Sequence, residues 1–208
     1  MIDIKDKVVL ITGAGRGSGR LLALALAAQG ARVAANDVSP VNVEQVVDQI
    51  NAEGGQAKSY IEDIAKKLGA QYVINQVEED FGRLDILINH ASVEPHVPLL
   101  QIDEWDWHRV LDVNLTGAFL MTQSAGRVMQ AAGGGVILNL IPPLQKPVVK
   151  ETVAGAAFVA SMMGLEGLTR QAAHELSPYG IRVHAVESGG DQVIERVMAL
   201  LLNGKEEG

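Results

Sequence analysis

Apolar residues follow two patterns that alternate along the chain. Short continuous apolar runs, such as "VVLIT" and "GVILNLI", are typical of strands that are buried on both faces of a sheet. They predict strands at Lys7–Thr12, Ala31–Asp37, Gln56–Asp63, Leu84–Ala91, Gly135–Ile141 and Ile181–Val186. The longer segments between them predict helices at Gly17–Gln29, Pro40–Glu53, Ala65–Phe81, Asp103–Gln130, Glu151–Leu176 and Val193–Leu202.

Strands that alternate with helices of ten or more residues imply crossover connections between parallel strands. The pattern therefore predicts an α/β protein with a doubly wound parallel sheet of about six strands and helices on both faces. No linker, repeat or low-complexity segment divides the chain. We predict a single domain over residues 1–208.

The composition excludes several kinds of binding partner and of chemistry. The chain has no cysteine, which excludes a disulfide framework, a thiolate metal site and a cysteine nucleophile, and no metal site is predicted. The lack of cysteine also fits a reducing compartment, so we expect a cytoplasmic protein. The net charge is −8 without a Lys/Arg cluster, so neither nucleic acid nor an anionic membrane is an expected partner. The start "MIDIKDKVVLITG" lacks the apolar core of a signal peptide.

The candidate chemistry begins with "TGAGRGSG" (Thr12–Gly19), which lies between the first strand and the first helix. It fits the pattern T-G-x-x-x-G-x-G and not G-x-G-x-x-G, because Ser18 stands where the latter has its third glycine. Glycines in such a turn let the backbone approach a pyrophosphate, whose oxygens the free N–H groups at the helix start can bind. The residues predicted to bind here are Gly13, Arg16, Gly17, Ser18 and Gly19. The alternative is a glycine-rich turn without a ligand.

Asp37 ends the second strand, twenty residues after Gly17. A carboxylate there can accept hydrogen bonds from both ribose hydroxyls of an adenosine, and it would repel a 2′-phosphate. Val38 offers no countercharge, so the sequence predicts NAD in preference to NADP. Arg16 is an argument for NADP instead, since its side chain could reach a 2′-phosphate. Asp37 could instead be a loop residue or a cap for the helix that begins near Pro40.

Further segments make the chain resemble the short-chain dehydrogenase/reductase family. They are the pair Asp63-Ile64, "NHAS" at Asn89–Ser92, "DVNLTGAF" at Asp112–Phe119 and "SPYGIRVHAV" at Ser177–Val186. The resemblance covers nearly the whole chain and implies a Rossmann-like fold that binds NAD(H), even if weakly. It adds Asp63, Ile64, Asn89 and Ala91 to the expected cofactor-binding residues, and it suggests that Ser92 crowds the cofactor.

The resemblance also points to a loss of catalysis. The family works with Tyr and Lys in Y-x-x-x-K, and these positions fall on Phe158 and Met162 of "FVASM". The family's serine would fall in "IPPLQ" (Ile141–Gln145), which has no hydroxyl. Asn114 matches the family's active-site Asn, but we predict that it is vestigial and structural. The family's substrate loop and seventh strand have no counterpart in this sequence, so we expect a truncated, degenerate member.

The sequence leaves three functions open: an NAD(H)-binding protein with impaired catalysis, an active oxidoreductase with other catalytic groups, and a structural paralogue that binds nothing and pairs with an active relative. The second would draw on charged residues of the loops at the strand ends. These are Glu94, His96, Lys146, Lys150, Glu151, Glu187 and Asp191. The family commonly pairs subunits through the helices near residues 103–130 and 151–176, so we also predict a homodimer.

Overall fold

The fold follows the alternation of strands and helices that the sequence predicts. A computed structural model describes residues 4–143, 154–188 and 192–203. The strands are β1 (Val8–Thr12), β2 (Arg32–Asp37), β3 (Gln56–Ile61), β4 (Ile86–Asn89), β5 (Gly135–Ile141) and β6 (Ile181–Glu187). They form one parallel sheet in the order β3-β2-β1-β4-β5-β6. The prediction of a Rossmann-like parallel sheet is confirmed.

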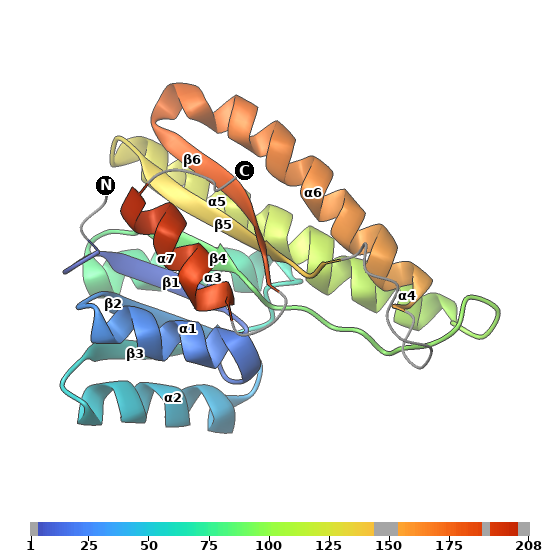
Figure 1. The fold of residues 1–208 in the computed structure, drawn as a ribbon, viewed down its shortest axis with the longest axis horizontal. Helices are drawn as coiled ribbons and strands as arrows, with labels where there is room; N and C mark the ends of the chain where they lie inside the picture. Colours follow the sequence, from blue (N-terminus) through green and yellow to red (C-terminus); the bar gives the residue numbers. More distant parts are fainter. Residues whose placement is uncertain (1–3, 144–153, 189–191, 204–208) are drawn as a thin grey trace.

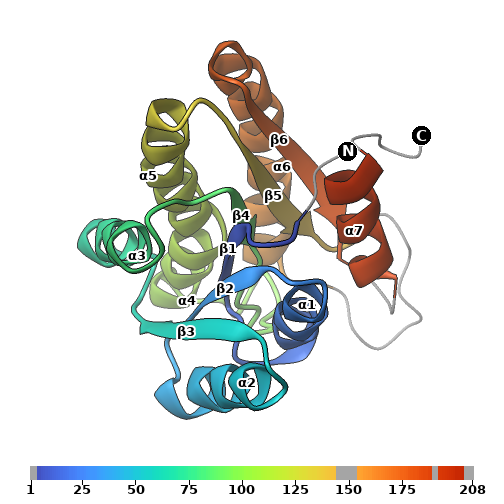
Figure 2. The same cartoon turned by 90° about the vertical axis from the view of Figure 1, so that its left-hand side faces the viewer.

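Helices cover both faces of the sheet (Figures 1 and 2). One face carries α1 (Gly17–Ala28), α2 (Pro40–Ala52) and α7 (Val193–Asn203). The other carries α3 (Lys67–Phe81), α4 (Glu104–Leu111), α5 (Ala118–Ala131) and α6 (Ala156–Leu176). A 3-10 turn, η2 (Ser177–Tyr179), joins α6 to β6.

Strands such as β1 are apolar along their whole length because a hydrophobic core lies on each face of the sheet. In β1, Val9 and Ile11 pack on the side of α1, whereas Val8 and Leu10 pack against α3 and α5. All four side chains are fully buried, so neither face of this strand could be polar.

The predicted helix over Asp103–Gln130 is not a single α-helix. A π-helical turn, η1 (Asp112–Gly117), separates α4 from α5. Asn114 fixes this turn to the preceding loop, because its side chain accepts a hydrogen bond from Val93 N (2.8 Å) and donates one to Val93 O (3.1 Å). Such wide turns cluster at functional sites, and this one lies at the carboxyl edge of the sheet.

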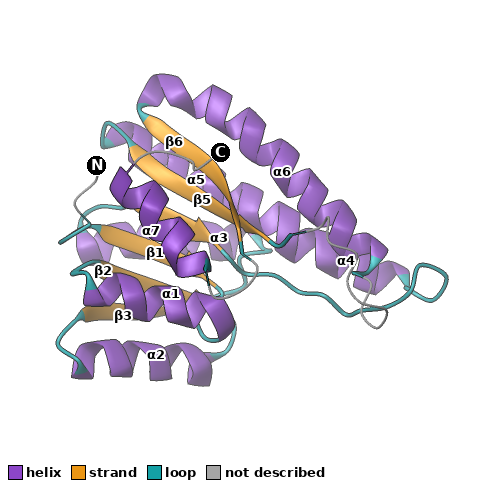
Figure 3. Cartoon of the chain, viewed as in Figure 1, coloured by secondary structure: helices purple, strands orange, loops and turns teal. Residues whose placement is uncertain are grey.

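The order of the strands reverses between β1 and β4. From β1 the chain continues to β2 and β3 on one side of the sheet, and from β4 it continues to β5 and β6 on the other side. Ligands of such sheets bind outside the carboxyl ends of the strands at this switch point. The connection from β4 to α4 leaves from the same edge (Figure 3). Within the described ranges, no helix combines the length and the apolar character that crossing a membrane requires.

Candidate nucleotide site

The turn between β1 and α1 has the backbone conformation that its glycines allow. Gly13 has φ +67°, and a Cβ atom on it would lie 2.9 Å from the Ala91 Cα atom. A Cβ atom on Gly19 would lie 2.3 Å from the Gly13 carbonyl oxygen. Only glycine fits at either position. The N-cap residue of α1, Arg16, makes no side-chain capping bond, so the N–H groups of the first turn remain free to bind an anion.

A cavity of about 520 Å³ opens in front of this turn. Nine of the predicted cofactor-binding residues line it: Gly13, Arg16, Gly17, Ser18, Asp37, Val38, Asp63, Ile64 and Ala91. Gly19 and Asn89 lie outside its lining, since both are buried behind it. The fold therefore brings predicted cofactor-binding residues from four separate segments of the sequence to one cavity.

Asp37 is held in a fixed orientation at the end of β2. Its Oδ2 atom accepts a hydrogen bond from Gly15 N (2.9 Å), and its Oδ1 atom accepts one from Ser39 N (3.0 Å). The first bond ties the carboxylate to the glycine-rich turn. Neither bond goes to an N–H group within α2, so the carboxylate does not cap that helix. Each oxygen keeps lone pairs for a ligand.

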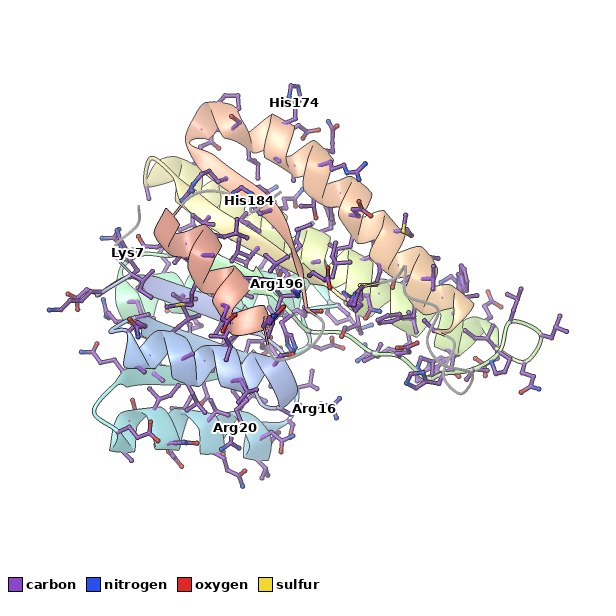
Figure 4. The ribbon with its side chains drawn as sticks, in the orientation of Figure 1. Lys7, Arg16, Arg20, His174, His184 and Arg196 are labelled. Carbon is purple, nitrogen blue, oxygen red and sulfur yellow. The ribbon has the colours of Figure 1, made fainter. Side chains whose placement is uncertain are left out.

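Arg16 and Arg20 lie near the start of α1 (Figure 4), and they differ in their contacts. Arg16 stands at the start of α1, in the cavity lining. Arg20 lies one turn further along the helix, and its guanidinium donates to the Gln49 side chain of α2 (2.8 Å). Of these two arginines, Arg16 is the one placed to meet a phosphate at the turn.

Asp63 has a partner that the sequence did not reveal. Arg109 of α4 donates to its Oδ2 atom (3.2 Å), and Ala65 N donates to its Oδ1 atom (3.0 Å). Both Asp63 and Arg109 line the cavity. Arg109 lies 46 residues away in the sequence, and no local pattern marks it.

His90 follows β4 and packs against the glycine-rich turn. Its Nε2 atom lies 3.1 Å from the Ser18 hydroxyl, while its Nδ1 atom is buried without a hydrogen-bond partner. Burial lowers the pKa of the imidazole, and the nearby backbone of Thr12 and Gly13 only partly offsets this effect. A neutral ring therefore supports Ser18. In the sequence, the only sign that His90 belongs to the site was its position in "NHAS", between the predicted residues Asn89 and Ala91.

Asn89 belongs to a buried polar network behind the site. Its amide donates to Asn139 Oδ1 (2.8 Å) and Thr122 Oγ1 (3.2 Å), and Asn139 donates to Thr169 Oγ1 (2.8 Å). The network joins β4 and β5 to α5 and α6. Buried polar groups that are paired in this way fix the register of the packed elements.

Asn114 is also engaged in structural contacts. Besides its two bonds to the Val93 backbone, its amide donates to Ser161 Oγ (3.0 Å), and Ser161 donates to Phe158 O (2.7 Å). Both side chains are buried, at 1% and 0% exposure, and neither lines the cavity. Asn114 therefore makes structural contacts here, and its vestigial character stays a prediction.

Phe158 and Met162 are buried in an apolar cluster where α6 begins. Their exposed fractions are 8% and 1%. The other buried members of this cluster, here called the α6 cluster, are Val110, Ala118, Ile141, Ala157 and Leu165.

The charged loop residues that could support alternative catalysis make polar contacts where the structure describes them. The Glu94 carboxylate accepts a hydrogen bond from Gly155 N (3.1 Å) and lies 3.3 Å from His96 Nδ1. Glu187 lies 3.6 Å from Arg196 on α7. None of these residues lines the cavity. The remaining candidates, Lys146, Lys150, Glu151 and Asp191, fall outside the described residues.

A second cavity, of about 530 Å³, lies at the opposite edge of the sheet, near Lys5, Gly30 and Gly54. It has no helix start and faces the amino ends of the strands, so we do not assign the nucleotide to it. Among the residues that the structure describes, no group of three His, Asp or Glu side chains could hold a metal ion.

Comparison with known proteins identifies the family. The family model described as "short chain dehydrogenase" matches residues 7–193. An uncharacterized oxidoreductase of Thermotoga maritima is 37% identical over 191 residues, which are 92% of this chain and 74% of the relative. A D-threitol dehydrogenase of Mycolicibacterium smegmatis is 35% identical over 183 residues, covering 88% of this chain and 69% of the relative. The chain belongs to the short-chain dehydrogenase family.

Solved structures agree with this assignment. A metagenomic short-chain oxidoreductase in complex with NADP superimposes with a TM-score of 0.86 at 32% identity, covering 96% of this chain and 91% of the other. A short-chain alcohol dehydrogenase from Sinorhizobium meliloti, described as putative, gives a TM-score of 0.82 at 35% identity, covering 89% and 72%. The family's fold binds nicotinamide dinucleotides, and the first of these structures holds one.

Proposed function

We propose that the protein binds NAD(H) at the glycine-rich turn and that its oxidoreductase activity is impaired or absent. The observation that carries the proposal is the burial of Phe158 and Met162 in the α6 cluster. By resemblance, these residues occupy the family's Tyr and Lys positions. An apolar, buried pair at these positions can neither donate a proton nor tune a donor.

The residues present fit the adenosine half of a dinucleotide. The free N–H groups at the start of α1 would hold the pyrophosphate, with Arg16 as countercharge. Asp37 would accept from the ribose hydroxyls, and Asp63 and Ile64 would lie beside the base. Bound NADH supplies a hydride.

The missing chemistry concerns the proton. Hydride transfer to a ketone leaves an alkoxide, which needs a positioned acid. Loss of a general acid costs about 10²–10⁴-fold in rate, and loss of each oxyanion donor costs about 10²–10³-fold. Asn114 cannot replace the acid, because an amide does not titrate and its hydrogen bonds go to Val93 and Ser161. We therefore expect turnover to fall below ordinary family rates by several orders of magnitude.

The preference for NAD over NADP is part of the same proposal. It rests on the fixed Asp37 carboxylate, whose negative charge would face a 2′-phosphate. The similar structure in complex with NADP belongs to a relative that is 32% identical, so the preference of this chain must come from its own residues. At the end of β2 these residues are Asp37 and Val38.

Two measurements test the proposal. Titration with NADH, followed by its fluorescence, should show saturable binding, and a chain that binds nothing would give none. A turnover screen with simple ketones and alcohols should show no oxidation of NADH above background. Steady oxidation by the purified protein would refute the claim of impaired catalysis and leave the binding claim intact.

We also propose a homodimer through α5 and α6. Phe119, Val159 and Met163 are apolar and exposed on these helices, and Ala160 lies exposed beside them. A groove of about 400 Å³ runs between the two helices, with Leu168 and Leu176 among its lining residues. A twofold pairing would bury this apolar surface.

One observation favours a second function, an active oxidoreductase with other catalytic groups. His96 has φ +54°, which is unusual for a residue with a side chain, and its ring faces the Glu94 carboxylate at 3.3 Å. Such a pair is able to transfer a proton. If the screen detects turnover, His96→Ala should abolish it, whereas the exposed His108→Ala serves as the matched control.

A further inference from the structure

We propose that the site binds the adenosine diphosphate part of its nucleotide and makes almost no productive contact with nicotinamide riboside. ADP-ribose should then bind about as tightly as NAD(H). This inference rests on the proposed nucleotide site and specifies the class of ligand that it takes. The protein would respond to adenosine diphosphate compounds in general and would not read the oxidation state of nicotinamide.

The adenosine side of the cavity has the groups that such a ligand needs. Asp37 is held by two backbone N–H groups, at 2.9 and 3.0 Å, so it is preorganised to accept from ribose. Asp63 is likewise held, by Arg109 and by Ala65 N. Together with the free N–H groups of α1 and the Arg16 side chain, these groups offer partners to the base, ribose and phosphates.

The other half of a dinucleotide would extend past the switch point toward the carboxyl ends of β4 and β5. On that side the described cavity lining ends with Ser92 and Val93, and it includes no residue of β5 or α6. Among the residues that the structure describes at this end of the fold, the α6 cluster contributes Ile141 from β5 and Phe158 and Met162 from α6. They present carbon atoms where a riboside would bring hydroxyls and a carboxamide.

Two polar side chains beside this cluster, on η1 and α6, are already engaged in hydrogen bonds. Asn114 bonds to both backbone groups of Val93 and to Ser161, and the Ser161 hydroxyl bonds to the Phe158 carbonyl. Both are buried, so a ligand would have to break these bonds to gain new ones. Polar groups that lose water without gaining partners reduce affinity. The riboside should therefore contribute little to binding.

Calorimetry with the full chain tests this inference by comparing ADP, ADP-ribose, NAD and nicotinamide mononucleotide. We expect ADP-ribose and NAD to agree within about threefold in Kd, and nicotinamide mononucleotide to show no binding at millimolar concentration. An NAD affinity about 30-fold or more above that of ADP-ribose would overturn the inference while leaving the proposed nucleotide site intact. No binding of any of the four would instead refute the site itself.

Two variants locate the contacts. Asp37→Ala should weaken ADP, ADP-ribose and NAD by the same factor, because all three share the adenosine ribose. Phe158→Leu keeps the α6 cluster apolar and should leave the ratio of NAD to ADP-ribose affinity unchanged, with ADP-ribose binding as the control for folding. A change in that ratio of about tenfold would show that nicotinamide touches Phe158 and would contradict the inference.

Discussion

Restoring the family's catalytic pair by Phe158→Tyr with Met162→Lys should destabilise the protein and should not restore turnover. Met162 is 1% exposed among the apolar side chains of the α6 cluster. A lysine there must either lose its proton or keep a charge without hydration. Full burial lowers a lysine pKa by about 3–5 units from about 10.4, which corresponds to a loss of about 4–5 kcal/mol at pH 7. The tyrosine hydroxyl adds about 1–3 kcal/mol if it finds no partner.

This loss has a characteristic pH dependence. Because burial lowers the pKa of the introduced lysine in the folded state, the unfolded chain binds the proton more readily. The destabilisation is therefore large at neutral pH and shrinks as the pH rises toward about 10. A domain of ordinary stability, about 5–15 kcal/mol, would lose a large share of it at pH 7.

Urea unfolding of the double variant at about pH 7 and 9.5 measures this difference, and NADH oxidation with simple ketones measures turnover. Met162→Leu is the matched control, because it keeps the site apolar and should cost less than about 1.5 kcal/mol. A double variant that remains within about 1 kcal/mol of the parent at pH 7 would show that position 162 reaches water or a partner. Robust turnover by that variant would refute the reasoning on the proton donor.

Three further changes test other parts of the molecule. Asp37→Ala should narrow the preference for NAD over NADP, as measured by calorimetry with both cofactors, and an unchanged ratio would mean that Arg16 decides it. Ala160→Glu should convert the expected dimer into monomers in light scattering, whereas a parent that is already monomeric would exclude the shared helices. His90→Asn should reduce the stability that the protein loses in acid. Burial lowers the pKa of His90 in the folded state, so the contribution of the neutral ring to stability is present above about pH 6.5 and is lost as the pH falls below that value. Urea unfolding at about pH 7.5 and 5.5 measures that loss, and an equal loss in both proteins would contradict it.

The fold was predictable mainly because the strands at the centre of the sheet are apolar and buried along almost their whole length. The β1 and β5 segments are apolar at almost every position, and both lie between two helical layers. The glycine-rich turn was predictable for a similar reason. Its conformation depends on residues that are adjacent in the sequence, and Gly13 and Gly19 leave no room for a side chain.

Parts of the site could not be predicted because they depend on contacts between distant residues. Arg109 reaches Asp63 across 46 positions, and His90 reaches Ser18 across 72. Neither residue belongs to a local pattern that fixes its partner. The π-helical turn at Asp112–Gly117 has the same origin, since it depends on the bonds between Asn114 and the Val93 backbone.

The family motif residues of this chain divide according to their hydrogen bonds. Asn89 and Asn114 each join elements of the fold through buried side-chain bonds, so replacing either of them would leave buried polar partners unsatisfied. By the resemblance, Phe158 and Met162 of α6 stand at the positions of the family's Tyr and Lys, and they pack in the α6 cluster without needing a polar partner. Such apolar residues can replace polar ones there without leaving a buried polar group unsatisfied, whereas Asn89 and Asn114 cannot be replaced in this way. A motif such as "DVNLTGAF" in this chain is accordingly evidence for the architecture, and under the proposed function α6 supplies no proton donor for catalysis.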